Sequence, residues 1–375
     1  MNRSLLLVCN DLVYLLNFRS PLIRAMVAEG LEVTVAGPEP TAEQAQALQA
    51  LGVRFEPWRL RKAGRNPFAE IASLCALGRI VWRVAPDVVF AYAIKPVIYA
   101  LWTAAWAKVP RRVAMITGLG YAFIDGPGLK RRLTRLAASW AYRTAFDSAH
   151  RVIFQNQDDE AHLIALGVLR RPEIAGQVPG SGVDLERFTA APLPPGPPVF
   201  LMVARLLRDK GVYEYVEAAR RVHARLPEAR FLLAGEGDEN PAAVPHAEVE
   251  AWRAGGVVEP LGHLADVRPA LAACHVFVLP SYREGLPRTG LEALATGRAI
   301  VTTDGPGCRE TVKPGVNGFL AQPRDARSLA EAMLEPVADL GRLQAMAISS
   351  RALAESRFEA KAVARRTLDL ILGRD

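Results

Sequence analysis

Cysteine is scarce in this chain, and its few copies argue against two kinds of site. The 375 residues contain only Cys9, Cys75, Cys274 and Cys308. No two of them have the spacing of metal ligands or of a redox pair, and four are too few for a disulfide scaffold. The six histidines show no zinc-binding spacing either. We therefore expect a reduced, cytoplasmic chain without a metal site.

Long hydrophobic runs are also missing. The apolar start Ser4–Cys9 is interrupted at Asn10, which is too early for the hydrophobic region of a signal peptide. No stretch approaches the roughly 18 uncharged apolar residues of a membrane span, and the longest candidate, Pro96–Ala107, is well short of it. The sequence predicts no simple membrane-spanning helix.

Several catalytic motifs are absent as well. The chain has no Walker loop, no Gly-x-Ser-x-Gly and no zinc-protease helix, which argues against P-loop NTPases, serine hydrolases and zinc proteases. Two Gly-x-Gly loops, Gly118–Gly120 and Gly235–Gly237, do not extend to Gly-x-Gly-x-x-Gly. They allow close backbone approach but lack the complete dinucleotide fingerprint.

Positive charge is present but unevenly spread. The formal net charge is +7, yet residues 51–150 alone hold 16 basic and 5 acidic residues. Such a local excess favours an anionic partner, either nucleic acid, acidic lipid head groups or a phosphorylated substrate. No nucleic-acid-binding motif accompanies it, so we expect no nucleic-acid partner.

Strand-like and helix-like segments alternate along both halves of the chain, which predicts an α/β fold of parallel sheets. The alternation breaks at 189–198, where five prolines and a glycine exclude a helix or a central strand. We interpret this segment as a linker between domains 1–188 and 189–355. Two doubly wound domains facing each other would form a cleft, with ligands at the carboxyl ends of the strands.

A basic turn follows the strand predicted at Val199–Ala204. Arg205 and Lys210 lie between this strand and the next helix, where backbone amides and the helix N-terminus also favour anions. The turn would suit a diphosphate, although a solvated basic loop has the same composition.

Two carboxylates lie near the start of a later predicted helix. Glu284 precedes Pro287, the expected first helical residue, and Glu292 follows about one turn inside the helix. Carboxylates at this spacing can accept hydrogen bonds from the vicinal hydroxyls of a sugar. Ordinary acidity at a helix start is the alternative.

A basic amphipathic helix is predicted at Leu129–Arg143. Its apolar residues recur every three or four positions, and Trp140 lies among them. Such a helix either faces a membrane surface or packs on a core with a solvated back. Its candidate membrane-facing residues are Lys130, Arg131, Arg132, Arg135 and Trp140. Nearby Trp58 and its basic neighbours could extend this surface.

The joint order of these segments resembles the retaining glycosyltransferases of family 4. The pattern consists of Arg205 and Lys210, Gly235-Glu-Gly237, Leu261-Gly262, and the Glu-x₇-Glu pair Glu284 and Glu292. The loops Thr117–Phe123, Gly237–Pro241 and Gly307–Arg309 resemble the branch that extends polyprenyl-diphosphate-linked glycans, including N-acetylgalactosaminyl transfer. The resemblance implies the GT-B fold, with two Rossmann-like domains and a final helix, about 356–375, that crosses back onto the first domain.

The resemblance also implies roles for individual residues. Arg205, Lys210 and Glu284 would be the catalytic residues, the two cations holding the donor diphosphate and Glu284 contacting the transferred sugar. Donor binding would involve Glu292 on the ribose, the backbone of Gly285, Leu286 and Pro287 at the sugar, and Leu264 near the base. The acceptor or sugar side of the first domain would comprise Asn10, Arg19, Lys95, Thr117, Gly118 and Gly120. Thr117 stands where many relatives have a histidine, and the first loop lacks their phosphate-binding glycines.

The function implied is retaining transfer of a sugar, expected to be an N-acetylhexosamine, from a UDP-sugar to a polyprenyl-diphosphate-linked saccharide. The partners would be a nucleotide-sugar donor, this lipid-linked acceptor and an anionic membrane surface, with no metal or other cofactor. The protein would lie on the inner face of the cytoplasmic membrane and act in O-antigen, capsule or related polysaccharide assembly. A nucleotide-sugar 2-epimerase of similar fold, or a non-catalytic nucleotide-sugar or lipid-surface binding module, are the alternatives.

Overall fold

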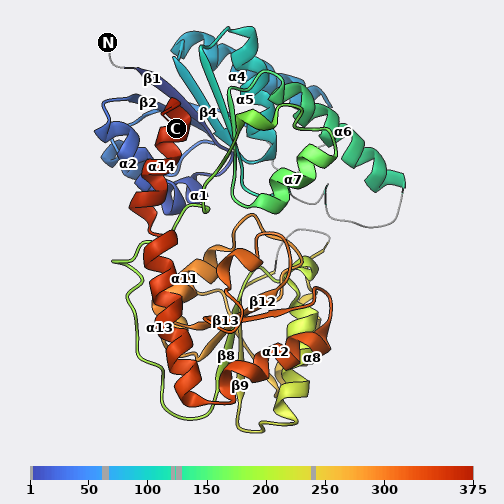
Figure 1. The fold of residues 1–375 in the computed structure, drawn as a ribbon. Coiled ribbons are helices and arrows are strands. Elements are labelled where there is room, and N and C mark those ends of the chain that lie inside the picture. Colours follow the sequence, from blue (N-terminus) through green and yellow to red (C-terminus); the bar gives the residue numbers. More distant parts are fainter. Residues whose placement is uncertain (1–2, 61–66, 120–122, 124–128, 238–241, 375) are drawn as a thin grey trace. The chain divides into compact units, whose positions relative to one another are not determined.

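Two compact units make up the chain in the structure, a computed structural model that describes residues 3–60, 67–119, 123, 129–237 and 242–374. Unit 1 comprises Met1–Ser181 and Lys361–Asp375, and unit 2 comprises Gly182–Ala360. Each unit is a parallel sheet with helices on both faces (Figure 1). The expected α/β class with two doubly wound sheets is confirmed.

Unit 1 contains a seven-stranded sheet in the order β3-β2-β1-β4-β5-β6-β7. Its strands are β1 (Ser4–Val8), β2 (Glu32–Gly37), β3 (Arg54–Pro57), β4 (Val88–Tyr92), β5 (Arg111–Ile116), β6 (Arg151–Phe154) and β7 (Ala175–Gln177). Its helices are α1 (Leu12–Phe18), α2 (Ser20–Ala28), α3 (Ala42–Ala50), α4 (Pro67–Val84), α5 (Ile94–Trp106), α6 (Leu129–Phe146), α7 (Gln157–Ala165) and α14 (Ala360–Leu372).

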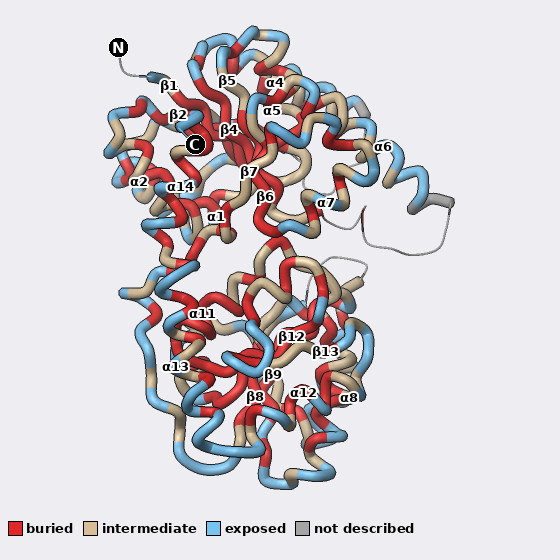
Figure 2. The backbone as a smooth tube through the Cα atoms, viewed as in Figure 1, coloured by how far each residue is buried: buried red, intermediate tan, exposed pale blue. Residues whose placement is uncertain are grey.

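Alternate side chains of these strands fill two separate cores, because successive strand residues point to opposite faces. Leu6, Val8 and Val89 face the core beneath α4, α5, α6 and α7. Leu5, Leu7 and Phe90 face the core beneath α1, α2, α3 and α14. Figure 2 shows the strands as the most deeply buried part of the unit.

The last helix joins unit 1 although its sequence follows unit 2. Leu368 and Ile371 of α14 are buried in the second core of unit 1, and Arg365 pairs with Glu29 at 2.7 Å. Arg111 on β5 donates to the carbonyls of Leu370 and Ile371. The structure divides the chain at 360/361, a few residues beyond the expected position near 356.

Unit 2 contains a six-stranded sheet in the order β10-β9-β8-β11-β12-β13. Its strands are β8 (Val199–Val203), β9 (Arg230–Ala234), β10 (Val258–Gly262), β11 (Val276–Leu279), β12 (Ala299–Thr303) and β13 (Gly318–Ala321). Its helices are α8 (Val212–His223), α9 (His246–Ala254), α10 (Arg268–Ala272), α11 (Arg288–Thr296), α12 (Ala326–Val337) and α13 (Leu340–Arg357), with 3-10 turns at Arg208–Lys210 and Arg309–Thr311.

The proline-rich segment at 189–198 is not the linker that its composition predicts. The first boundary between the units lies at 181/182, so this segment belongs to unit 2. It is attached there by backbone contacts, since Ala191 N donates to Thr296 O at 3.1 Å and Arg298 donates to Pro192 O at 3.0 Å. Prolines exclude a regular helix or strand in this segment, but its backbone carbonyls can still accept hydrogen bonds. The segment can therefore pack against unit 2 as an irregular stretch of chain.

Candidate functional site

The order of the strands indicates where each unit can bind a ligand. In a doubly wound sheet, ligands bind at the carboxyl ends of the two strands where the winding reverses. The reversal lies between β8 and β11 in unit 2 and between β1 and β4 in unit 1. Arg205 and Ser281 follow the two unit 2 strands, and Asn10 and Ala93 follow the two unit 1 strands.

The turn after β8 in unit 2 presents the two predicted cations. Arg205 is exposed, and Lys210 ends the 3-10 turn Arg208–Lys210 just before α8. Gly211, with φ +75°, follows it, and a Cβ there would lie 2.2 Å from the carbonyl oxygen of Pro280. Glycine therefore lets this turn press against the loop after β11.

The two loops at the winding reversal bring Lys210 and Glu284 together. Lys210 Nζ lies 2.5 Å from Glu284 Oε1, and both side chains are more than four-fifths buried. Gly307 packs against the backbone of Glu284. Its φ is +72°, and a Cβ there would come too close to the carbonyl oxygens of Glu284 and Gly285, so the position requires glycine. Glu284 N donates to Pro306 O at 2.9 Å. The position of the carboxylate is therefore set by three loops.

Glu292 lies one turn inside α11, close to its predicted position, but it has a partner that the sequence interpretation missed. Arg288 Nε lies 3.1 Å from Glu292 Oε1, and Arg288 also donates to Gly182 O at 3.1 Å. Glu292 is 7% exposed. Burial raises the pKa of this carboxyl, and Arg288 opposes the increase. The i, i+4 spacing of Arg288 and Glu292 is the sequence signal that could have revealed the pair.

The remaining donor-side candidates lie in the same unit. Gly285 and Pro287 are buried, and Leu286 is half-buried. Pro287 is the N-cap of α11 rather than its first residue. Leu264 lies two residues beyond β10 and packs on a core of unit 2. A cavity of about 240 Å³ at the ends of β9 and β10 has Gly235, Gly237 and Gly262 in its described lining, but not Leu264.

Arg19 is the most unusual of the unit 1 candidates. It lies between α1 and α2 and is 2% exposed. Its guanidinium carbon lies 5.2 Å from the centre of the Tyr92 ring. Among the described residues, its Nε and Nη2 atoms have no hydrogen-bond partner. A buried cation in this state is costly unless an anion joins it.

A strained backbone follows Tyr92 at the same winding reversal. Ala93 has φ +68° and ψ 159°, a conformation that L-residues rarely adopt. The next predicted residue, Lys95, lies 2.7 Å from Glu70 on α4, and Glu70 also accepts a hydrogen bond from Tyr99. Glu70 was not among the sequence candidates. Lys95 is therefore a paired cation.

The structure describes some of the other predicted site residues of unit 1 and not the rest. Asn10 is half-buried after β1, and Thr117 and Gly118 are half-buried after β5. Gly120 and the side chains of Lys130 and Arg131 lie outside the described residues. Arg132 is exposed, Arg135 is half-buried, and Trp140 is 63% exposed on α6.

Trp58 is not a surface residue, which corrects its assignment to the basic surface. Its side chain is fully buried, and its indole N–H donates to Ser73 O at 2.9 Å. The basic residues beside it in sequence therefore do not indicate the direction of the ring, because neighbours on an extended chain point to opposite sides.

In the part of the chain that the structure describes, no group of three or more His, Cys, Asp or Glu side chains could hold a metal ion. None of the described helices has the length and apolarity that crossing a bilayer requires.

Comparisons with known proteins identify both units. Residues 19–175 match the model described as a glycosyl transferase 4-like domain, and residues 197–339 match the model for glycosyl transferases group 1. The chain is 33% identical over 328 residues to a Campylobacter jejuni N,N'-diacetylbacillosaminyl-diphospho-undecaprenol alpha-1,3-N-acetylgalactosaminyltransferase, covering 84% of each protein.

A second curated relative is an Escherichia coli UDP-Gal:alpha-D-GlcNAc-diphosphoundecaprenol alpha-1,3-galactosyltransferase. It is 28% identical, with 72% of this chain and 71% of the relative covered. Among solved structures, Anabaena HepE in complex with UDP and glucose aligns with a TM-score of 0.76 at 17% identity, covering 99% of this chain and all of that one. A Thermosynechococcus elongatus sucrose-phosphate synthase aligns with a TM-score of 0.78 at 18% identity, covering 100% and 99%. These two likenesses concern the fold.

Proposed function

We propose that this chain, a member of the family 4 glycosyltransferases of GT-B fold, transfers a sugar from a UDP-sugar to a polyprenyl-diphosphate-linked saccharide. The sugar would be an N-acetylhexosamine, and the transfer would retain its anomeric configuration. The reaction would serve bacterial cell-surface glycan assembly. The glycosyltransferase class is established by the family. The sugar, the nucleotide and the acceptor are the proposal, and the names of the two curated relatives support them.

One observation supports the donor site above all others, namely the Lys210–Glu284 pair at the winding reversal of unit 2. An ammonium has three donor hydrogens, so Lys210 can keep its contact with Glu284 and also bind a phosphate oxygen. The neighbouring Arg205 adds a second cation. As the sugar leaves, negative charge grows on the diphosphate, and preorganised cations stabilise that charge.

Glu284 and Glu292 would orient the donor. Glu284 is held by the Gly307 loop, and its carboxylate would accept a hydrogen bond from a sugar hydroxyl. Glu292 is fixed by Arg288 and would accept hydrogen bonds from the ribose. We assign no side chain as a nucleophile, and catalysis then consists of positioning and charge stabilisation. The two cations take the electrostatic role that a metal has in other transferases, so we propose a metal-independent reaction.

Arg19 would bind a phosphate of the acceptor. Two of its nitrogen atoms have no hydrogen-bond partner among the residues that the structure describes, and they match the need of a diphosphate for hydrogen-bond donors. The strained Ala93 follows the adjacent strand, and such strain is often kept at binding sites. Asn10, Lys95, Thr117 and Gly118 lie at the carboxyl ends of the same sheet and would contact the acceptor or the sugar.

We also propose a peripheral position on the inner face of the cytoplasmic membrane, because the acceptor is anchored there. The basic residues of α6 would contact acidic lipid head groups. Among those whose side chains the structure describes, Arg132 is exposed and Arg135 is half-buried, which supports this orientation of unit 1.

A donor panel tests the proposed reaction. UDP- and GDP-sugars are screened for binding, and the bound donors are then incubated with a short-chain prenyl-diphosphate sugar. Transfer from a UDP-N-acetylhexosamine with retention of anomeric configuration is the expected result. Transfer only from a GDP-sugar would refute the donor assignment. A sugar product formed without any acceptor would instead indicate the epimerase reaction.

A further inference from the structure

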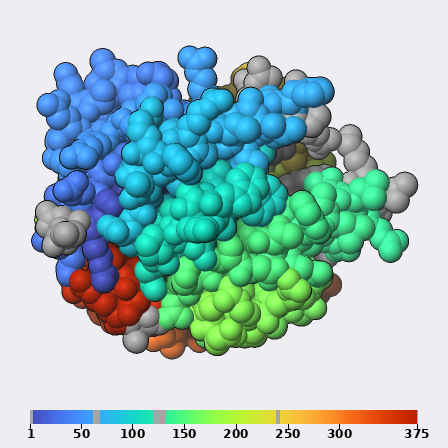
Figure 3. Space-filling model, turned by 90° about the horizontal axis from the view of Figure 1, so that it is seen from above, coloured from blue at the N-terminus to red at the C-terminus, as the bar shows by residue number. Residues whose placement is uncertain are grey.

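The outer surface of the α4–α5–α6 layer is apolar where a solvated helix surface is normally polar. The three helices pack side by side over one face of the unit 1 sheet, and Figure 3 shows them as adjacent bands. Large side chains remain exposed on each of them. We call the following set the aromatic face: Phe68, Ile71 and Trp82 on α4, Trp106 on α5, and Leu133, Leu136 and Trp140 on α6.

The exposure of the tryptophans is too large to be incidental. Trp82 is 80% exposed, Trp106 71% and Trp140 63%. The chain has six tryptophans, so half of them lie on this one surface. Scattered apolar residues are common on protein surfaces, but contiguous ones indicate a partner.

The residues of α4 form a single stripe. Phe68, Ile71, Cys75, Arg79 and Trp82 recur at three- or four-residue spacing, and all five are exposed. The opposite side of the same helix contributes Leu77, Ile80 and Val81 to the core. The helix is therefore apolar on both its buried and its outer side, which packing against its own sheet does not require.

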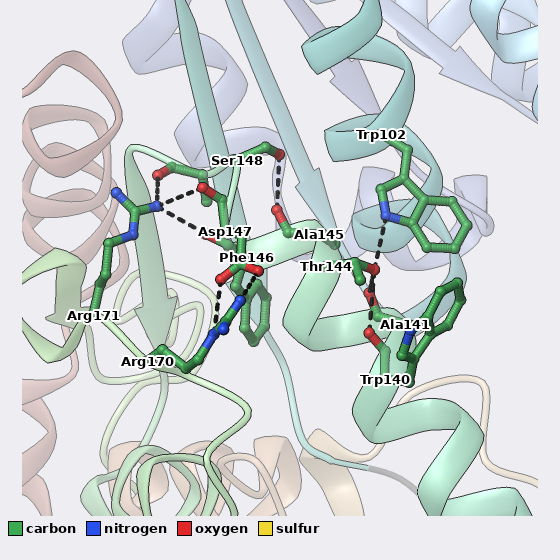
Figure 4. Close-up of polar contacts among 11 residues, drawn as sticks. Trp102, Trp140, Ala141, Thr144, Ala145, Phe146, Asp147, Ser148, Arg170 and Arg171 are labelled. Carbon is green, nitrogen blue, oxygen red and sulfur yellow. Dashed lines mark hydrogen bonds and ion pairs between the residues drawn. The ribbon is translucent and has the colours of Figure 1, made fainter.

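Polar and aromatic contacts fix α6 against α5. Trp102 on α5 donates from its indole N–H to Thr144 Oγ1 at 3.2 Å, and its ring meets the Trp140 ring edge to face at 6.1 Å. Figure 4 shows these contacts. Arg171 donates to the carbonyls of Phe146, Asp147 and Ala149 at the end of the helix. Trp140 is thus held in place while most of its ring stays exposed.

The charged residues of the three helices are mostly basic. The sequences of α4, α5 and α6 contain eight Lys and Arg residues and one acidic residue, Glu70. Glu70 is bonded to Lys95 and Tyr99. Exposed cations, among them Arg79 and Arg132, lie on the same helices as the aromatic residues. Tryptophan rings with basic neighbours suit the boundary between anionic head groups and acyl chains.

We infer that the aromatic face inserts into the surface of an anionic bilayer, with Trp82, Trp106 and Trp140 as its anchors. This inference rests on the proposed function for the membrane as partner. It adds, to the contact made by the α6 charges, a second contact made by apolar side chains from three helices. Charge attracts the protein, and burial of the rings retains it. Binding should therefore persist in high salt, which screens exposed charges but not apolar contact.

Vesicle co-sedimentation of the full chain tests the inference. The vesicles contain phosphatidylcholine with phosphatidylglycerol, and the triple variant Trp82→Ala, Trp106→Ala and Trp140→Ala is compared with a matched control. The control, Leu340→Ala with Ile348→Ala, removes exposed apolar side chains from unit 2. We expect the triple variant to lower the partition coefficient about tenfold or more, in both low and high salt, and the control to leave it unchanged.

Fluorescence quenching and activity distinguish the remaining outcomes. Brominated acyl chains should quench the tryptophan fluorescence of the wild type, and only weakly that of the triple variant, which retains the buried Trp58 and the half-buried Trp102 and Trp252. Equal partitioning of variant and wild type, or release of the wild type by salt alone, would overturn the inference. So would a self-association that the triple variant abolishes, because the face would then bind a second copy. Transfer to a water-soluble short-chain acceptor should be unchanged in the variant. If transfer is absent even in the wild type while vesicle binding follows the prediction, the proposed function fails and the docking surface stands.

Discussion

Replacing Arg19 with methionine should make the protein more stable and less active. Methionine is flexible, apolar and shorter by the guanidinium group, so it can pack beside Tyr92 without a buried cation. In the structure Arg19 is 2% exposed, and two of its nitrogen atoms have no hydrogen-bond partner among the described residues. The change therefore removes a group that the fold leaves unsatisfied.

The expected size of the effect follows from these contacts. Each unsatisfied buried donor costs about 1–3 kcal/mol, and the lost interaction with the Tyr92 ring offsets about 2 kcal/mol of that cost. Two such donors cost about 2–6 kcal/mol, so the net gain in the free energy of unfolding is about 0–4 kcal/mol, with about 2 kcal/mol as the central value. For a unit of about 200 residues, a gain of about 2 kcal/mol raises Tm by roughly 4–8 °C.

Two measurements and a matched control check the predicted changes in stability and activity. Thermal unfolding gives Tm, and steady-state transfer gives the KM for the acceptor, which should rise while donor binding is unchanged. Arg298→Met is the control: Arg298 is fully buried, but its guanidinium donates to the carbonyls of Leu271, Pro192 and Ala272. Its replacement removes three hydrogen bonds, so Tm should fall. A lower Tm for Arg19→Met, or normal transfer by it, would refute the assignment of Arg19 to an acceptor phosphate.

Three further predictions concern the donor site. Lys210→Met should reduce turnover by about 10²–10³, the usual effect of losing one preorganised charge-stabilising donor, and near-normal turnover in a UDP-release assay would remove Lys210 from the site. Glu292→Gln should weaken UDP-sugar binding in calorimetry. Burial raises the pKa of Glu292, so at a pH above the ordinary carboxyl pKa the ionised Glu292 destabilises the folded state. Near neutral pH the Glu292→Gln variant should therefore have a higher Tm than the wild type. This difference in Tm should shrink as the pH falls through the titration range of the carboxyl. An unchanged Tm difference between acidic and neutral pH would contradict this reasoning. Prolonged treatment with EDTA should leave transfer intact, since Arg205 and Lys210 supply the positive charge, and its complete loss with recovery on adding Mg²⁺ or Mn²⁺ would show that a metal is required.

The central strands could be predicted from the sequence, and most of the edge strands could not. Ten strands are predicted from the sequence, and they include every interior strand of both sheets. They are Ser4–Cys9, Glu32–Ala36, Asp87–Tyr92, Arg112–Thr117, Arg151–Gln155, Val199–Ala204, Arg230–Ala234, Val257–Leu261, Val276–Pro280 and Ala299–Thr303. The three missed strands, β3, β7 and β13, all lie at sheet edges, and β3 and β7 have no fully buried residue. A strand buried on both faces leaves a continuous apolar run, whereas an edge strand leaves only a short mixed segment.

For the site, the positions of the residues could be predicted from the sequence, but their contacts could not. The strand ends that carry Arg205 and Glu284 could be predicted, because motifs after parallel strands lie at one edge of the sheet. The contact between Lys210 and Glu284 could not, because it depends on close backbone approaches at Gly211 and Gly307. The exposure of Trp82 and the burial of Trp58 depend likewise on which side of a segment meets the core.

A structure of the protein with a bound UDP-sugar tests the central claim most directly. The account predicts the diphosphate beside Arg205 and Lys210 at the ends of β8 and β11, with the ribose hydroxyls on Glu292. A nucleotide bound anywhere else, with Lys210 still paired to Glu284 and no phosphate near Arg205, would contradict it.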